Sequence, residues 1–214
     1  MITHLEWDSA HFGFPIGMVQ GPLPEVSAEH HCLYFLAPES DLAAHQQARL
    51  CGFVNRGERV TLAVSDWERH DLPPLRKAVP SDLDALAAID FPDSRFSQDP
   101  RFSCERVRAM YLAWMQRLLD STYVATTGDS VMAYVSCAEE SGKARICLFA
   151  IAEPFRGRGI GRQLVDQAKW WAAERGLRQL TVVTQGSNQA GLRLYQRNGF
   201  HIVRREVWFH WWRP

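Results

Sequence analysis

Residues 156–161 have the sequence RGRGIG and carry the strongest chemical signal in the chain. They follow an apolar stretch that favours a strand and open an amphipathic stretch that favours a helix. A glycine-rich turn at a helix N-terminus presents free backbone N–H groups and the positive end of the helix dipole. Arg156, Arg158 and Arg162 add positive charge. The pattern predicts a site for a phosphate or a pyrophosphate.

Two common phosphate-binding motifs do not fit this loop. A P-loop needs GK[ST] after the glycines, and that sequence is missing here. A dinucleotide fingerprint needs G-x-G-x-x-G, whereas the chain has G-x-G-x-G, and the strand expected over residues 180–184 ends without an acidic residue. The remaining alternative is a glycine-rich helix start that has a structural role and binds no ligand.

The hydrophobic pattern predicts the elements that position the loop. Ser81 and Asp84 resemble a capping box at the start of a short helix. From residue 75 onward the expected order is β-α-α-β-β-β-α-β-α-β, which predicts a mixed, mostly antiparallel α/β domain with one βαβ crossover. The expected ranges are a strand over 75–79, a helix over 104–120, strands over 122–126, 131–137 and 144–152, a helix over 160–175, a strand over 180–184, a helix over 188–198 and a strand over 200–212.

A polar stretch that runs into two prolines at residues 71–74 predicts a boundary between two domains. Residues 1–74 then form a small N-terminal α/β domain that contributes to the acceptor site, and residues 75–214 form the main domain. Residues 52–60 resemble residues 199–207, and each segment leads from an expected helix into an expected strand. The resemblance indicates either a repeated unit or the general similarity of helix–glycine–strand junctions.

Composition limits the class of protein. Of 214 residues, 46% are hydrophobic, and the 24 basic residues balance the 24 acidic ones. A chain without net positive charge lacks the electrostatic footprint of a nucleic-acid binder, and no apolar run reaches the ~20 residues of a membrane helix. Residues 1–6 do not resemble a secretory signal, and the five cysteines form no CxxC pair, so we expect a cytoplasmic protein with reduced thiols. His30, His31 and Cys32 lack metal-ligand spacing, so no metal is expected.

The loop resembles the R/Q-x-x-G-x-G/A acetyl-CoA loop of the GNAT (GCN5-related N-acetyltransferase) superfamily, and the resemblance extends over residues 75–212. It implies the GNAT fold, acetyl-CoA as co-substrate and N-acetyl transfer. In that family the loop amides hold the CoA pyrophosphate, and the preceding strand pairs with the pantetheine arm. The cofactor-binding residues implied here are Phe149, Ala150, Ile151, Arg156, Gly157, Arg158, Gly159, Ile160, Gly161 and Asn188.

The same resemblance places Tyr195 beside the thioester sulfur and Asn188 against the pantetheine. A tyrosine suits the first role, because its hydroxyl keeps a proton at neutral pH and can give it to a leaving thiolate. A backbone N–H near Ala150 or Ile151 can stabilise the oxyanion. The residues alone are equally typical of a core aromatic at Tyr195 and of a helix N-cap at Asn188.

The acceptor amine must lose a proton before it attacks, and the sequence has no strong motif for a base. Glu58, Glu6 and Asp8 are the candidates, acting through a water molecule. Each is also typical of a surface carboxylate.

Short blocks of sequence resemble the TDP-fucosamine acetyltransferase branch of the GNAT family, namely residues 5–16, 94–96 and 184–188. That resemblance implies a small-molecule amine acceptor, a nucleotide sugar such as TDP-4-amino-4,6-dideoxygalactose, and a homodimer. Trp7 and Phe12 would stack on a ring of the acceptor and Arg95 would pair with its diphosphate. Residues 5–16 are equally typical of a packed N-terminal strand. Another small amine, a protein amine and a non-catalytic acetyl-CoA-binding module are the alternatives.

Overall fold

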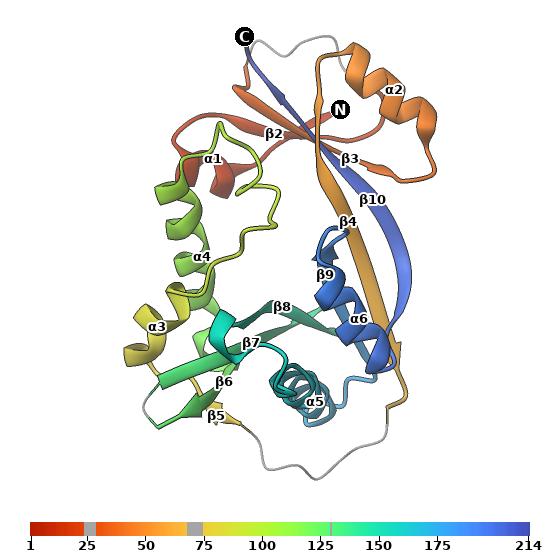
Figure 1. Ribbon diagram of the computed structural model, residues 1–214. Helices are drawn as coiled ribbons and strands as arrows, with labels where there is room; N and C mark the ends of the chain where they lie inside the picture. Colours follow the sequence, from red (N-terminus) through yellow and green to blue (C-terminus); the bar gives the residue numbers. More distant parts are fainter. Residues whose placement is uncertain (24–28, 68–74, 129) are drawn as a thin grey trace.

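The computed structural model describes residues 1–23, 29–67, 75–128 and 130–214. It contains a mixed sheet flanked by helices (Figure 1), which confirms the predicted mixed α/β fold. No helix in the described ranges is both long and apolar enough to cross a membrane.

Along the chain the elements are β1 (Ile2–His4), α1 (Glu6–Phe12), β2 (Ile16–Val19), β3 (Cys32–Pro38), α2 (Leu42–Leu50), β4 (Val54–Ser65), β5 (Arg76–Lys77), α3 (Leu83–Ala87), α4 (Cys104–Leu118), β6 (Thr122–Thr127), β7 (Ser130–Glu140), β8 (Lys143–Ile151), α5 (Ile160–Ala173), β9 (Gln179–Gln185), α6 (Gln189–Arg197) and β10 (His201–Trp212).

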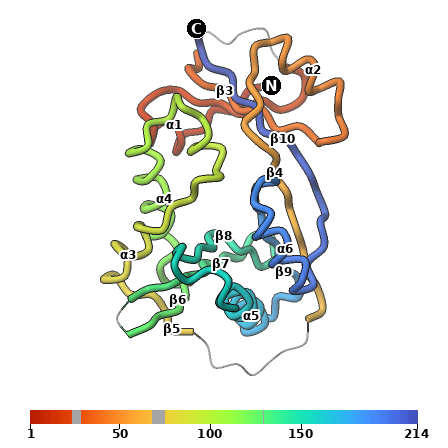
Figure 2. Tube along the Cα trace, viewed as in Figure 1, coloured from red at the N-terminus to blue at the C-terminus, as the bar shows by residue number. Residues whose placement is uncertain are grey.

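Strands from both ends of the chain share one sheet, with the order β1-β2-β3-β10-β4-β9-β8-β7-β6-β5 among the described residues. The pairs β2–β3 and β8–β9 are parallel, and the other neighbours are antiparallel. The C-terminal strand β10 lies between β3 and β4, and Figure 2 shows it in blue beside β4 in orange. The division into 1–74 and 75–214 stays a prediction, and its expected linker over 71–74 lies outside the described residues.

The sheet contains a repeated β-α-β unit. Strand β3, helix α2 and strand β4 have the same lengths and spacings as β9, α6 and β10, at an offset of 147 residues. The pairings correspond as well, because β3–β10 and β9–β4 are both antiparallel. The resemblance of residues 52–60 to 199–207 therefore reflects two equivalent segments, which pair with each other at the centre of the sheet.

Both faces of the sheet are covered. On one face, α5 and α6 pack through Leu164, Val165 and Tyr195 against the apolar residues of β4, β7, β8 and β9. On the opposite face, α3 and α4 pack against β6, β7 and β8 through residues that include Leu86 and Met115. An aromatic cluster beneath α1 joins that helix to α4 and to the ends of β3 and β10. This arrangement places β8 between two helical layers and covers β9 on the face of α5 and α6.

Two local expectations from the sequence were wrong. The helix start after Pro80 is capped by Asp82, whose Oδ2 accepts a hydrogen bond from the N–H of Val79 at 2.8 Å, and not by Ser81 with Asp84. Residues 6–12, expected as a loop or a packed strand, form α1, with its acidic side chains in the first turn where the helix dipole favours them. The strand expected after the helix that precedes residues 52–60 is β4, which begins at Val54 and ends at Ser65.

Candidate active site

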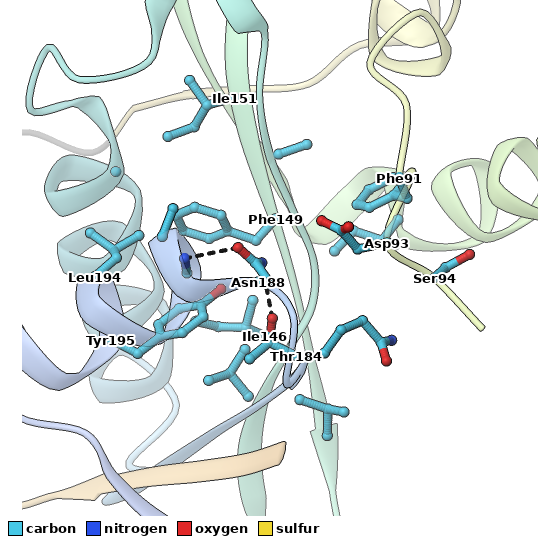
Figure 3. Close-up of a pocket in the computed structure, with 18 of the residues that line it drawn as sticks. Phe91, Asp93, Ser94, Ile146, Phe149, Ile151, Thr184, Asn188, Leu194 and Tyr195 are labelled. Carbon is cyan, nitrogen blue, oxygen red and sulfur yellow. Dashed lines mark hydrogen bonds between the residues drawn. The ribbon is translucent and has the colours of Figure 1, made fainter. Parts of the chain in front are cut away.

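A cavity of about 1460 Å³ lies where β8 and β9 separate. Its walls come from the segment after α3, from α4, from β8, from the loop before α5 and from β9 and α6. Figure 3 shows Asn188 and Tyr195 on one wall, Phe91, Asp93 and Ser94 on the other, and β8 between them. Ordinary small-molecule pockets measure about 300–1,000 Å³, so this cavity has room for one large ligand or for two.

The cavity exists because two parallel strands stop pairing. Strands β8 and β9 are paired over residues 144–146 and 180–182, after which β8 continues against β7 and β9 against β4. One edge of residues 147–151 is therefore left without a neighbouring strand, and its backbone N–H and C=O groups are open to a ligand. Phe149, Ala150 and Ile151 all line the cavity at this edge.

Residues 156–161 form the turn before α5, where the sequence predicts an anion site. Gly157 and Gly159 have φ angles of 75° and 80°, a left-handed conformation that favours glycine. The N–H groups of residues 157–161 have no hydrogen-bond acceptor in the described part of the chain. Arg156 fixes the turn to the strand before it by donating from Nε to the carbonyl oxygen of Ile151 at 3.1 Å. The turn thus offers a run of free donors beside a strand edge.

The loop residues divide by their role. The cavity lining includes Arg156 and the three glycines but not the side chains of Arg158 and Ile160. Ile160 is buried in the core, and the Arg158 guanidinium lies 5.6 Å from the centre of the Phe155 ring, so either residue would meet a ligand through its backbone N–H. A Cβ on Gly161 would lie 3.0 Å from Leu194, so this glycine allows α5 and α6 to approach closely.

Asn188 is the N-cap of α6, as one reading of the sequence predicts. Its Oδ1 accepts from the N–H of Gly191 at 2.9 Å, and its Nδ2 donates to Thr184 Oγ1 at 3.0 Å (Figure 3). A Cβ on Gly191 would collide with the asparagine side chain at 2.6 Å, so the cap requires glycine there. One amide hydrogen of Asn188 remains for a ligand in the cavity, and the capping role and the binding role are compatible.

Tyr195 lies about two turns further along α6 and is 4% exposed. Its ring packs edge-on against Phe149, with centroids 5.7 Å apart, and its hydroxyl lies inside the cavity (Figure 3). Burial raises the pKa of Tyr195. The hydroxyl therefore keeps its proton through neutral and alkaline pH and is ready to act as a donor.

The three carboxylates proposed as bases lie outside the cavity lining. Glu58 forms an ion pair with Arg205 across the β4–β10 pair, and it occupies the space beside Gly186. The side chain of Glu6 is 92% exposed. Burial raises the pKa of Asp8, which lies on α1. None of the three faces the point where β8 and Tyr195 meet.

Arg95 lines the end of the cavity away from the glycine-rich loop, and its surroundings are aromatic. Its guanidinium carbon lies 4.1 Å from the ring centres of Tyr34, Phe96 and Trp208. Its Nη1 donates to His210 Nε2 at 2.9 Å. No carboxylate of the described residues lies within ion-pair distance of Arg95, and the carboxylate of Asp8 on α1 acts on its charge from further away.

A buried network holds Arg95 in place. Because the arginine donates to Nε2, His210 is neutral and its Nδ1–H donates to Asp99 Oδ2 at 2.7 Å. The same oxygen accepts from Trp212 Nε1 at 2.9 Å and lies 3.1 Å from Arg56 Nε. Burial lowers the pKa of His210 to about 4. Burial alone would raise the pKa of Asp99, but hydrogen bonds from His210 and Trp212 hold that pKa at about 2.

The two aromatic residues predicted to stack on the acceptor lie outside the cavity lining. Phe12 is 5% exposed and packs among the rings of Phe96 and Phe102. Trp7 is exposed on α1 and stacks on His11, with centroids 5.0 Å apart. Their roles as substrate ligands stay predictions.

Sequence reasoning did not identify Trp208 and His210 as residues of the site. Trp208 lines the cavity, and His210 fixes Arg95. The signal available was the alternation of β10, because Trp208, His210 and Trp212 share one face of the strand while Phe209 and Trp211 point to the other.

Comparison with known proteins gives a consistent picture. A family model described as "Acetyltransferase (GNAT) family" matches residues 83–200. The dTDP-fucosamine acetyltransferase of Escherichia coli O6:H1 is 28% identical, over 98% of this chain and 97% of that protein. The spore coat polysaccharide biosynthesis protein SpsD of Bacillus subtilis is 26% identical, over 84% of this chain and 66% of that protein.

The fold agrees with solved structures. A GCN5-related N-acetyltransferase from Sphaerobacter thermophilus superposes with a TM-score of 0.63 at 22% identity, over 86% of this chain and 60% of that chain. At this level of identity, the likeness concerns the fold.

The loop geometry predicts how a methyl group added at Gly159 changes the affinity for acetyl-CoA. Gly159→Ala should weaken acetyl-CoA binding by about 5- to 30-fold, because a left-handed residue with a Cβ costs roughly 1–2 kcal/mol when the ligand holds the turn in place. Isothermal titration calorimetry measures the affinity. Gly176→Ala is the matched control, since Gly176 has a φ of 70° and open space around it but ends α5 outside the cavity lining. Equal losses of affinity in the two variants would contradict the assignment.

The buried network predicts how stability depends on pH. The pKa of His210 is about 4 in the folded chain against an ordinary value of 6.5, so between these values the unfolded chain binds more protons. The free energy of unfolding should therefore decrease as pH falls from about 6.5 towards 4, and Asp99, with a pKa of about 2, extends the decrease at lower pH. Urea denaturation at pH 7, 6, 5 and 4 measures it. His210→Gln should flatten the dependence above pH 4, and an unchanged slope would contradict the assignment.

Proposed function

The chain belongs to the GNAT family of acetyltransferases, and we propose that it acetylates the amino group of a nucleotide-linked amino sugar such as TDP-4-amino-4,6-dideoxygalactose. As a member of this family it is an acetyl-CoA-dependent N-acetyltransferase. One observation carries the choice of acceptor, namely the similarity to a dTDP-fucosamine acetyltransferase over 98% of the chain. The similarity to a spore coat polysaccharide biosynthesis protein supports an acceptor used in surface glycans.

Acetyl-CoA fits the part of the cavity between β8 and the glycine-rich loop. The free N–H groups of residues 157–161 suit the pyrophosphate, and Arg156 and Arg162 add positive charge in the cavity wall. The unpaired edge of residues 147–151 suits the two amide groups of the pantetheine arm, which would extend the sheet as a strand does. The remaining amide hydrogen of Asn188 is a further donor for that arm.

The reaction needs a neutral amine, an electrophilic carbonyl and a protonated leaving group. The amine nitrogen forms a bond to the thioester carbon, and the backbone N–H of Ile151 stabilises the negative charge on the carbonyl oxygen, because the N–H of Ala150 points to β7. When the C–S bond breaks, the thiolate takes the proton of the Tyr195 hydroxyl. The phenolate then recovers a proton that the acetylated nitrogen releases, so the tyrosine is unchanged after each turnover.

The acceptor fits the opposite end of the cavity. The Arg95 guanidinium is fixed there between three aromatic rings, and within the described ranges no carboxylate lies close enough to form an ion pair with it, although Asp8 acts on its charge from further away. A diphosphate is a suitable partner for it, and Trp114 and Trp208 in the same walls are suitable surfaces for a sugar or a base. The two ends of one cavity thus accommodate a donor and an acceptor whose reacting atoms meet beside Tyr195.

We also expect a homodimer in the cytoplasm. The carboxyl-terminal strand is rich in tryptophan, and Trp212, which lies outside the cavity lining, is only half-buried, which leaves apolar surface for a second copy. Light scattering coupled to size-exclusion chromatography measures the mass, and a monomer at micromolar concentration would contradict the dimer.

Tyr195→Phe should lower kcat by about 10²- to 10⁴-fold, because only the general acid is removed. Free thiol release from acetyl-CoA measures the rate, and calorimetry should give an unchanged affinity for acetyl-CoA. Tyr134→Phe is the matched control, since that hydroxyl is buried outside the cavity lining and has no hydrogen-bond partner among the residues that the structure describes. A Tyr195→Phe enzyme within threefold of the wild type would contradict the role of the hydroxyl.

The acceptor is tested by comparing TDP-4-amino-4,6-dideoxygalactose with the free amino sugar that lacks the nucleotide. We expect rapid thiol release with the first and a value of kcat/KM at least about 100-fold lower with the second, since the charge at Arg95 would lose its partner. Spermidine and a peptide with a free N-terminus are assayed in the same way, as representatives of another small amine and of a protein amine. Turnover of either of these, without turnover of the TDP sugar, would contradict the proposal.

A further inference from the structure

The reaction leaves one group unassigned, namely the base that accepts the proton of the acceptor ammonium. The carboxylates suggested by the sequence, Glu6, Asp8 and Glu58, lie outside the cavity lining. A base must come within hydrogen-bond reach of the nitrogen. The candidates for the base are therefore the carboxylates that line the cavity.

Three carboxylates do so among the described residues, namely Asp90, Asp93 and Asp166. Asp166 lies on α5 at 3.7 Å from Arg162, on the side of the glycine-rich loop. Asp90 lies 3.7 Å from Arg108 of α4. Asp93 has no ion pair and no hydrogen bond to a residue that the structure describes. It is the carboxylate of this set that remains free for a ligand.

Hydrogen bonds to the two residues before Asp93 hold the backbone of this segment in place. Ser97 Oγ donates to the carbonyl oxygen of Phe91 at 2.8 Å, and Gln98 Nε2 donates to that of Pro92 at 2.9 Å. The ring of Phe91 stacks on Tyr111 of α4, with centroids 4.4 Å apart. The segment that carries Asp93 is thus attached to α4, while the Asp93 carboxylate has no partner in the described part of the chain.

The direction of this carboxylate completes the argument. Figure 3 shows it pointing into the cavity from the wall opposite Tyr195, towards the strand that carries Phe149 and Ile151. We propose that Asp93 binds the ammonium group of the acceptor and acts as the general base for acetyl transfer. An acceptor amine held there approaches the thioester from the side opposite the leaving-group acid.

The proton balance is simple. The Asp93 carboxylate takes one proton from the bound ammonium, which leaves a neutral amine that forms the C–N bond. Asp93 is exposed to solvent, so it passes this proton to water, and one proton is released for each acetyl group transferred. The second proton leaves the nitrogen when the C–S bond breaks and restores the proton that Tyr195 gave to the thiolate.

The test compares Asp93→Asn with Asp90→Asn, a control in the same segment whose carboxylate is already paired with Arg108. With TDP-4-amino-4,6-dideoxygalactose as acceptor, Asp93→Asn should lower kcat/KM for the acceptor by about 10²- to 10³-fold. The affinity for acetyl-CoA, measured by calorimetry, should stay within twofold and shows that the variant folds. Asp90→Asn should remain within threefold of the wild type. Equal losses in the two variants, or activity of Asp93→Asn within threefold of the wild type, would overturn the proposal.

A second experiment tests the binding of an ammonium group at Asp93 even if the wild-type enzyme does not acetylate this sugar. The side-chain carboxyl carbons of ¹³C-labelled aspartate are followed by NMR in the CoA-bound enzyme while propylammonium chloride is added. We expect a saturable shift of the Asp93 signal, identified by its loss in Asp93→Asn, and none at Asp90. A shift confined to other carboxylates, or no saturable shift at all, would overturn the assignment of Asp93 while leaving the acetyltransferase function untouched.

Discussion

The separation of β8 from β9 is the constraint on which the rest of the structure depends. Two parallel strands that stop pairing leave backbone donors and acceptors without partners, which is unfavourable unless water or a ligand satisfies them. The layers on both faces of the sheet hold the strands apart, so the opening cannot close by simple pairing. The glycine-rich turn lies at one end of this opening and Tyr195 along its side. The acetyl-CoA position proposed above places two amides and a pyrophosphate beside these exposed groups.

The acceptor end depends on the strands that the N-terminal segment adds. Because β10 lies between β3 and β4, its tryptophan and histidine side chains are brought to the cavity end where Arg95 stands. The repeated β-α-β unit explains this geometry, since each copy supplies one of the two central strands. The two copies of the β-α-β unit differ in the side chain at one position of their helices. Ala48 occupies the position in α2 that Tyr195 occupies in α6, so only the second copy carries the hydroxyl group.

The elements of the second half were predictable because local signals agree there. One strand–turn–helix unit is indicated by the glycines of residues 156–161 together with the apolar period of α5. The next unit is indicated by the cap at Asn188, where α6 begins. The network of Arg95, Asp99 and His210 was not predictable, because its members are up to 115 residues apart and meet only through the order of the sheet. The base was missed for a similar reason. Asp93 carries no motif, and its importance follows from the absence of a partner among the described residues, which only the folded chain reveals.

A crystal structure of the enzyme with bound CoA tests the central claim most directly, because that claim concerns where the cofactor lies. We expect the pyrophosphate on the N–H groups of residues 157–161, the pantetheine amides paired with residues 147–151, and the sulfur within hydrogen-bond distance of the Tyr195 hydroxyl. A pantetheine arm that leaves the edge of β8 unpaired, or a sulfur remote from Tyr195, would contradict the account.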